Sequence, residues 1–225
     1  GSEMCIRDRS WTVMADLLAR LFRDEKMVAK VKKRLPYMFK LAEIEVSRGG
    51  KVGMEAGTLR ERVIIAMLKY YFGEHKVKEP DITVHEVDVI IEGHSNPISI
   101  KTKTGTGYSG VKLVWTVDWE KVDEFVGNYK PKTDIIFSRI NWNKFGEFCY
   151  IPLEIQQKLF RKYGEQYFKK PNQGTNPRGI EINSIVLKEA VAKSKEMGYV
   201  IDIYWEATGV VYDPYNRWIE LWAEE

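Results

Sequence analysis

The residues of this sequence with the clearest chemical potential are an acid and a lysine on two neighbouring predicted strands. Asp88 lies in an apolar stretch that predicts a strand over residues 84–91, and Lys101 lies in a second predicted strand over residues 98–104. The turn residues between these stretches indicate a hairpin. If Asp88 lies opposite Lys101 in that hairpin, the carboxylate and the amine share one face of the sheet. Their neighbours are apolar, and a buried acid and lysine need polar partners.

A third charged side chain, Glu61, lies on the helix that the sequence predicts most clearly, over residues 58–72. The apolar stripe of this helix begins one turn after Glu61, so we expect the Glu61 carboxylate to point toward the same sheet. Thr58 and Glu61 also match a capping box, in which Glu61 would only close the first turn. The structural alternative for Asp88 and Lys101 is a simple cross-strand ion pair.

One reaction accounts for these three groups together. Hydrolysis of a phosphodiester needs a divalent cation to neutralise phosphate charge and activate water. Mg²⁺ binds carboxylate and carbonyl oxygens, which Asp88, Glu61 and the main-chain carbonyl of Ile100 could supply, and we expect Mn²⁺ to substitute for Mg²⁺. Lys101 would stabilise the charge that develops on the phosphate, or position and help deprotonate the attacking water. The sequence therefore predicts a Mg²⁺-dependent nuclease.

The elements that position these side chains are helices and strands interleaved along the whole chain. This order predicts the α/β (α+β) class, with a central mixed β-sheet flanked by helices. Further strands are expected over residues 111–117, 134–141, 147–151, 180–183, 199–206 and 217–222. Further helices are expected over residues 11–22, 25–47, 153–168 and 185–197, with one more that Asp118 caps and that ends before Pro131.

The composition limits the function classes. The 225 residues include 35 Lys and Arg against 32 Asp and Glu, and a net charge of only +3 excludes a polybasic binder. Two cysteines and three scattered histidines argue against a zinc site or a histidine cluster. Cys149, in an apolar strand, is expected to be a packed thiol. No apolar run is long enough to span a membrane and no signal peptide is visible, so we expect a cytoplasmic protein without a membrane partner.

The chain is expected to form one domain after a short leader. Residues 1–10 have no periodicity and are interpreted as a tag or leader outside the fold. Residues 11–225 are expected to form a single endonuclease domain, with an N-terminal helical part (11–57), a catalytic core (58–131) and a recognition and dimerisation part (132–225). Four aromatic residues of the last predicted strands are expected to lie in the core or at a dimer interface. These residues are Tyr204, Trp205, Trp218 and Trp222.

Two stretches of the chain are strongly basic, although the net charge of the whole chain is close to zero. Residues 20–34 hold seven basic and two acidic side chains, and residues 158–178 hold six basic and one acidic. The first stretch can be a solvated helix face or a face that contacts phosphates. Within the second, the loop 169–178 is the best candidate for base readout, with an ordinary solvated loop as the alternative, because amide and guanidinium groups pair with base edges. Its candidate side chains are Asn172, Gln173, Asn176 and Arg178.

Two glycine-rich segments hold the other candidate DNA contacts. The glycines at 105, 107 and 110 match a dinucleotide fingerprint, but a strand rather than a helix follows them, so we reject that interpretation. The segment is either a hairpin turn or a loop that follows DNA, with Tyr108, Ser109 and Lys112 at the groove and Arg139 as a further contact. Met54, among glycines, could insert between base steps from the minor groove or pack onto the following helix.

The order of the catalytic candidates along the chain resembles that of a known group of nucleases. A helix with Glu61, a strand with Asp88, a turn and a strand with the run Ser99-Ile100-Lys101 together resemble the PD-(D/E)xK nuclease superfamily. The resemblance implies a restriction-endonuclease-like fold. In this chain Ser99 stands where the superfamily usually has an acid, which leaves two protein carboxylates. A second metal would then require a further group such as Glu55 or Glu86.

Longer segments resemble one family more specifically. They lie at residues 97–105, 110–118, 150–154 and 174–182. These segments are similar to the ThaI family of type II restriction endonucleases, over about residues 45–200. The resemblance implies a homodimer that cuts double-stranded DNA at CGCG with blunt ends and uses Mg²⁺. The alternatives are a structure-specific repair or junction nuclease and, because of Ser99, a catalytically inactive DNA-binding module.

Overall fold

The structure of the protein is a computed structural model that describes residues 16–53, 55–81, 84, 86–114, 119–172 and 179–224, without the side chains of 119 and 120. The expected leader over residues 1–10 lies outside the described residues. None of the described helices combines the length and the apolar character that crossing a membrane requires.

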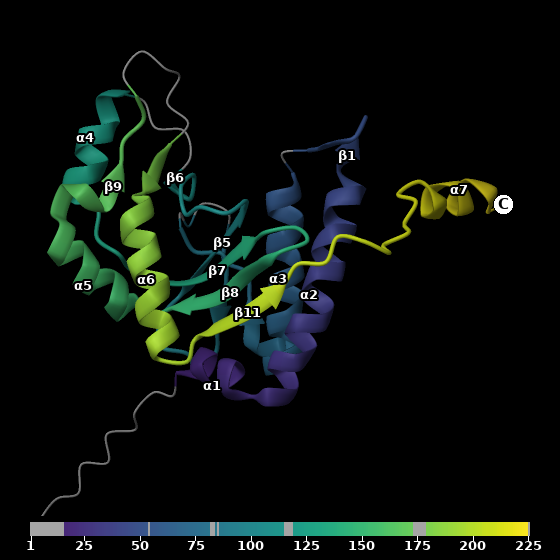
Figure 1. Cartoon of the computed structure of the whole chain (residues 1–225), viewed down its shortest axis with the longest axis horizontal. Coiled ribbons are helices and arrows are strands. Elements are labelled where there is room, and N and C mark those ends of the chain that lie inside the picture. The colour runs from purple at the N-terminus through teal and green to yellow at the C-terminus, as the bar shows by residue number, and fades with distance from the viewer. Residues whose placement is uncertain are drawn as a thin grey trace, which may run out of the picture.

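A four-stranded sheet forms the centre of the molecule, between two groups of helices (Figure 1). Its strands run in the order β11 (Val200–Tyr204), β8 (Phe145–Ile151), β7 (Asp134–Ile140) and β5 (Ile98–Thr104). β5 and β7 are parallel, whereas β7 pairs with β8 and β8 with β11 in antiparallel fashion. The sheet is therefore mixed, as the sequence predicts.

The first face of the sheet packs against the N-terminal helices. These are α1 (Leu17–Arg23), α2 (Glu25–Glu45) and α3 (Ala56–Phe72). Ile98 and Ile100 of β5 point into this core, because alternate residues of a strand share a face. The intervening Ser99 and Lys101 consequently face the other side of the sheet.

The second face packs against the C-terminal helices. These are α4 (Trp119–Asn128), α5 (Leu153–Tyr163), the 3₁₀ turn η2 (Gly164–Tyr167) and α6 (Ser184–Glu196). Cys149 is fully buried among their apolar side chains, which confirms the prediction of a packed thiol. Burial also raises the pKa of this thiol above its ordinary value, so it is a poor nucleophile. A small antiparallel sheet lies beside this core in the order β6 (Lys112–Val114), β10 (Ile180–Ile182) and β9 (Phe168–Lys169).

The hairpin expected over residues 84–104 is wrong in its first strand. Among the described residues of the predicted first strand, only β4 (Ile90–Ile91) is a regular strand. It pairs with β3 (Val77–Lys78), which follows the 3₁₀ turn η1 (Glu74–Lys76). A single antiparallel bridge joins Val89 to Ile98 of β5. The described part of this apolar run therefore pairs with two segments, β3 and β5, whereas the predicted hairpin has β5 as its single partner.

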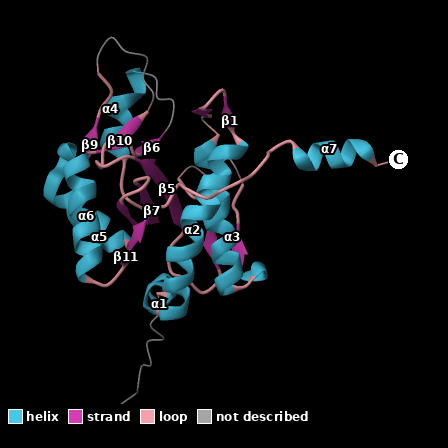
Figure 2. Ribbon diagram, turned by 45° about the vertical axis from the view of Figure 1, so that its right-hand side comes forward, coloured by secondary structure: helices cyan, strands magenta, loops and turns pink. Residues whose placement is uncertain are grey.

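The two remaining elements lie at the outside of the molecule. A short hairpin of β1 (Ser47–Arg48) and β2 (Lys51–Val52) joins α2 to α3. The strand predicted over residues 217–222 is wrong, because this segment forms the helix α7 (Asn216–Ala223). Figure 2 shows α7 at the end of an extended segment, away from the rest of the chain. Trp205 is fully buried, while Tyr204, Trp218 and Trp222 are exposed.

Candidate active site

Asp88 reaches β5 through its side chain rather than through the predicted cross-strand pairing. The backbone N–H groups of Asp88 and Val89 both donate to the Ile98 carbonyl, so the register differs by two residues from the predicted one. Asp88 Oδ2 accepts hydrogen bonds from the Ile100 N–H at 2.5 Å and from the Ser99 hydroxyl at 3.1 Å. The carboxylate is therefore fixed beside the middle of β5, next to Lys101.

Glu61 lies in the second turn of α3, and the predicted capping box is wrong. The helix begins at Ala56, two residues before the expected start, and Glu55 occupies the cap position without a side-chain hydrogen bond. The helix ends at Phe72, as predicted, and is capped by Gly73, whose φ of 102° favours glycine. With no cap to close, the Glu61 carboxylate is directed into the cleft beside β5.

The electrostatics of Glu61 show that the three predicted groups are close together. Burial and, after it, the negative charge of Asp88 raise the pKa of Glu61 to about 7, although the positive charge of Lys101 partly opposes both. Asp88 and Lys101 therefore both lie within the electrostatic range of Glu61. Two neighbouring carboxylates in a half-buried site, such as Glu61 and Asp88, repel each other, and binding of a proton or a cation relieves that repulsion.

A cleft of about 960 Å³ contains this group. Glu61, Asp88, Ile100 and Lys101 all line it, together with Lys112 of the neighbouring small sheet. Thr58, the other residue of the predicted capping box, lines it as well. The sequence analysis did not single out three further lining residues, which share no motif that could have identified them. They are Thr102, Phe125 and Lys132.

Glu86 also lines the cleft, whereas Glu55 does not. Its φ of 67° is an uncommon backbone conformation for a residue other than glycine. Lys132 lies 3.9 Å from a Glu86 carboxylate oxygen. Of the two acids considered as helpers for Asp88, only Glu86 therefore lies at the candidate site.

The donor set of the cleft suits a hard cation that keeps part of its water shell. Among the described residues, no group of three or more acid, histidine or cysteine side chains could hold a metal on its own. Mg²⁺ does not need one, because it typically binds one or two carboxylates together with waters and substrate phosphates. Asp88, Glu61 and the Ile100 carbonyl are oxygen donors of this kind, and a cation would relieve the repulsion that raises the pKa of Glu61.

The candidate DNA contacts around the glycine-rich turn are tied into internal networks. The Tyr108 hydroxyl donates to Glu147 at 2.7 Å, and Arg139 forms a two-point ion pair with the same carboxylate. The Arg139 guanidinium also lies 5.0 Å from the centre of the Tyr108 ring and donates to the Thr106 carbonyl at 2.9 Å. Ser109 is exposed on the same turn. These contacts hold the turn in place, and the sequence did not indicate Glu147 as their centre.

Lys112 lies at the rim of the cleft with an acidic partner. Its ammonium group donates to Glu181 at 2.6 Å, and Glu181 also accepts from Lys169 and from the Gly110 N–H. Burial opposes ionisation of Glu181, but these lysines hold the pKa of its carboxyl below the ordinary value. Glu181 therefore joins the glycine-rich turn to the base of the loop 169–178.

The remaining predicted DNA contacts lie in the loop 169–178 and at residue 54. Met54, Gln173, Asn176 and Arg178 lie outside the described residues. Asn172, the last described residue before this gap, is exposed.

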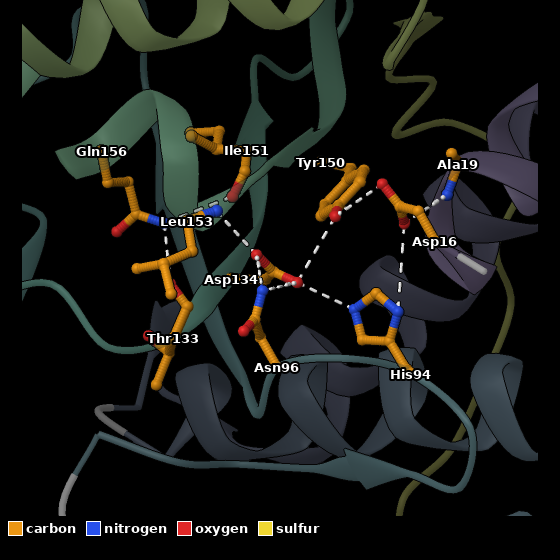
Figure 3. A network of polar contacts seen from close by, with 10 residues as sticks. All are labelled: Asp16, Ala19, His94, Asn96, Thr133, Asp134, Tyr150, Ile151, Leu153 and Gln156. Atoms are coloured by element: carbon orange, nitrogen blue, oxygen red, sulfur yellow. Dashed lines mark hydrogen bonds and ion pairs between the residues drawn. The ribbon is translucent and has the colours of Figure 1, made fainter. Parts of the chain in front are cut away.

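A fully buried carboxylate, that of Asp134, lies at the start of β7, and Figure 3 shows its partners. Asp134 is fully buried, and its carboxylate accepts from the Leu153 N–H at 2.6 Å and from Asn96 at 3.3 Å. His94 Nε2 lies 2.8 Å from its other oxygen, and the Tyr150 hydroxyl lies 3.4 Å from the same atom. The Tyr150 hydroxyl also donates to Asp16, the cap of α1, at 3.0 Å. This network joins helices and strands of both faces, and no pattern in the sequence indicates it.

Comparisons with known proteins agree with this geometry. The family profile described as "Restriction endonuclease ThaI" matches residues 21–224. A solved structure described as "Restriction endonuclease in complex with substrate DNA" is 48% identical to the chain, with a TM-score of 0.84. The similarity covers 93% of this chain and 100% of that one. No curated protein matches the sequence.

Proposed function

The chain belongs to the ThaI restriction endonuclease family, and from this premise we propose that it hydrolyses double-stranded DNA at the cleft that contains Asp88, Glu61 and Lys101. It is a site-specific nuclease, and we infer that it is a PD-(D/E)xK enzyme. The observation that supports the proposed site is that these three groups line one cleft.

Each residue has a distinct role in this proposal. Mg²⁺, or Mn²⁺ in its place, supplies charge neutralisation and activation of water when it is bound. Asp88 is the central ligand, because two donors from β5 fix its carboxylate. Glu61 and the Ile100 carbonyl complete the protein donors, with Glu61 also holding a water. Lys101 places its positive charge where charge develops on the phosphate, or orients the attacking water.

Ser99 is a positioning residue in this scheme. Its hydroxyl donates to Asp88 Oδ2, where an acidic residue would instead repel that oxygen. The chain thus has two carboxylates and a neutral donor, with Glu86 as the further acid on the cleft wall. This arrangement supports a site with at most two direct protein carboxylates.

The DNA contacts of the proposal surround the cleft. Lys112 at its rim contacts phosphates, and Tyr108, Ser109 and Arg139 hold or line the turn that follows the groove. In this proposal the loop 169–178 reads bases through Asn172, Gln173, Asn176 and Arg178, and Met54 inserts between base steps. We also propose that two copies act as a homodimer, because a palindromic site such as CGCG presents two equivalent strands to cut.

Sequencing the ends of digestion products tests this proposal. Plasmid DNA incubated with the protein and Mg²⁺ should give discrete fragments with blunt ends at CGCG, and chelation of Mg²⁺ should abolish cutting. A random smear would overturn site-specific cleavage. Cutting restricted to branched DNA would identify a repair or junction nuclease. Specific binding without cleavage in Mg²⁺ or Mn²⁺ would identify an inactive binding module.

Titration of the metal in the absence of DNA tests the donor set separately. Calorimetry with Mn²⁺ should give a binding signal that Asp88→Asn removes. The matched control is Asp123→Asn, because Asp123 is a surface acid that pairs with Lys170. If Asp88→Asn leaves Mn²⁺ binding unchanged, Asp88 is not the central ligand.

A further inference from the structure

The C-terminal helix α7 extends away from the body of the molecule (Figures 1 and 2), and it exposes large apolar side chains. Tyr215, Trp218, Ile219 and Trp222 follow helical spacing and form one stripe. Trp218 is 50% exposed, Ile219 62% and Trp222 90%. Isolated helices shorter than about 12 residues are marginal in water, so an eight-residue helix needs a packing surface. The family match extends to residue 224 and thus includes α7.

An unfilled apolar groove lies between α2 and α3. Its volume is about 400 Å³. The side chains that line it come from one stripe of each helix. They are Met27, Val31, Leu35, Met38, Val63 and Met67. The groove and α7 can pack together, because both present apolar side chains at helical spacing.

The charges around the groove complement those of α7. Lys30 and Arg34 flank the groove, and Arg62 lines the hollow that continues it toward the end of α2. On α7 and directly after it, Glu220 and Glu224 are exposed acids. A helix with an apolar stripe and acidic edges therefore fits a groove with an apolar floor and basic edges.

The chain's own contacts direct α7 away from this groove. Glu45, at the end of α2, accepts from the Tyr212 hydroxyl at 2.5 Å and from Arg217 at 3.1 Å. The Arg217 guanidinium also lies 4.4 Å from the centre of the Trp218 ring. Because Arg217 is the second residue of α7, this clamp holds the first turn of the helix and leaves no linker to fold back.

We propose that α7 of one copy docks into the α2–α3 groove of a second copy, and that the two copies exchange these helices reciprocally. Such an exchange is self-complementary, as a two-fold dimer requires. It buries Trp218 and Trp222, the residue type most often dominant at interfaces. The inference rests on the proposed homodimer and names the surface that forms it.

Disulfide trapping between two differently marked proteins tests the exchange. One protein carries Trp222→Cys, and the other carries Met67→Cys and a tag that increases its mass. Both carry Cys5→Ser, and the buried Cys149 does not react. After mixing and mild oxidation without DNA, we expect a covalent heterodimer on a non-reducing gel. Met197→Cys in place of Met67→Cys is the matched control, because Met197 is 46% exposed and distant from the groove in sequence.

Sedimentation of the unmodified protein, with and without DNA, separates the possible failures. A dimer that gives no trapped heterodimer would overturn the exchange but leave the proposed homodimer. A monomer under both conditions would overturn both. Cross-linking within one chain of the Met67→Cys/Trp222→Cys double variant at high dilution would place α7 in its own groove and overturn the exchange.

The double variant Trp218→Ser/Trp222→Ser gives a second measurement without cysteine chemistry. We expect its dimer dissociation constant to rise at least tenfold, with an unchanged circular dichroism spectrum apart from α7. If DNA binding falls while the dimer mass is retained, α7 contacts nucleic acid instead, and the proposal is overturned.

Discussion

Two carboxylates near the strands β5 and β7 have opposite surroundings. Asp134, at the start of β7, is enclosed by four neighbours that offer hydrogen-bond donors and is inaccessible to solvent. Asp88, beside the middle of β5, has two donors on one oxygen and faces a cleft that also contains Glu61. A buried acid whose acceptors are satisfied stabilises the fold, whereas an acid with acceptors left open toward a cleft is available for a cation and a substrate.

The largest effect that separates the two carboxylates is on catalysis. Asp88→Asn should lower the rate of plasmid cleavage at least about 1,000-fold, because a central metal ligand contributes several kcal/mol to the transition state. The melting temperature should remain within a few degrees of the original, since the side chain is partly exposed. Asp123→Asn should change neither quantity. If the Asp88→Asn protein still cleaves DNA at the original rate, Asp88 is not a catalytic carboxylate and does not differ from Asp134 in this respect.

The reverse pattern is expected at the buried network. Asp134→Asn should lower the free energy of unfolding by about 3 kcal/mol, because the amide places a donor against existing donors. Denaturant unfolding measures this change. The cleavage rate per folded molecule at low temperature should change only a few-fold. A large catalytic loss in a stable Asp134→Asn protein would show that the network serves the site directly.

The pKa of Glu61 predicts a smaller effect that depends on pH. The folded state keeps the Glu61 proton up to about pH 7, whereas the unfolded chain loses it near the ordinary value of 4.5. Without a metal, ionisation of Glu61 therefore reduces stability as the pH rises from 4.5 through 7. Glu61→Gln should stabilise the metal-free protein by roughly 1–2 kcal/mol above pH 7, after allowance for its partial exposure, and by almost nothing at pH 4.

Thermal unfolding over this pH range in the presence of a chelator measures the Glu61 effect. Asp123→Asn is a suitable control, because Asp123 is a surface acid that pairs with Lys170. If Glu61→Gln increases the stability equally at pH 4 and above pH 7, the pKa of Glu61 is not raised.

The smallest expected effect concerns Ser99. Ser99→Ala removes one of the two donors to Asp88 and should cost about 1 kcal/mol of stability. We expect the cleavage rate to fall several-fold, since the Ile100 N–H still holds the carboxylate. Single-turnover cleavage and denaturant unfolding of the same samples measure both quantities. Unchanged values in both would show that the Ser99 hydroxyl does not position Asp88.

The local patterns predicted the parts of the site that depend on a single element. The strand over residues 98–104 has the predicted bounds, because its alternation of apolar and polar residues reports one buried face. The stop at Gly73 was also predictable, since only glycine adopts its backbone angles readily. Glu61, Asp88 and Lys101 line one cleft, as their types and order suggested.

The parts that depend on partners distant in sequence were not predictable. The register at Asp88 changed because β3, a segment with no strong pattern of its own, pairs with β4. The segment at 217–222 holds apolar residues in a pattern that suits a strand or a helix equally, and the helix formed. His94, Asn96 and Tyr150 meet at Asp134 only in the folded chain, so their spacing in the sequence does not predict the network.

The hydrogen bond from the Ile100 N–H to Asp88 has a consequence for the sheet as a whole. β5 is the last strand in the order of the central sheet, and among the described residues only the bridge at Val89 pairs with its open side. Open edges offer unpaired N–H and C=O groups to strands of other molecules and promote aggregation. By accepting the Ile100 N–H, the carboxylate of Asp88 occupies one of these groups and places a negative charge at the edge. The same side chain that is proposed to hold the metal thus protects the protein from edge-to-edge association.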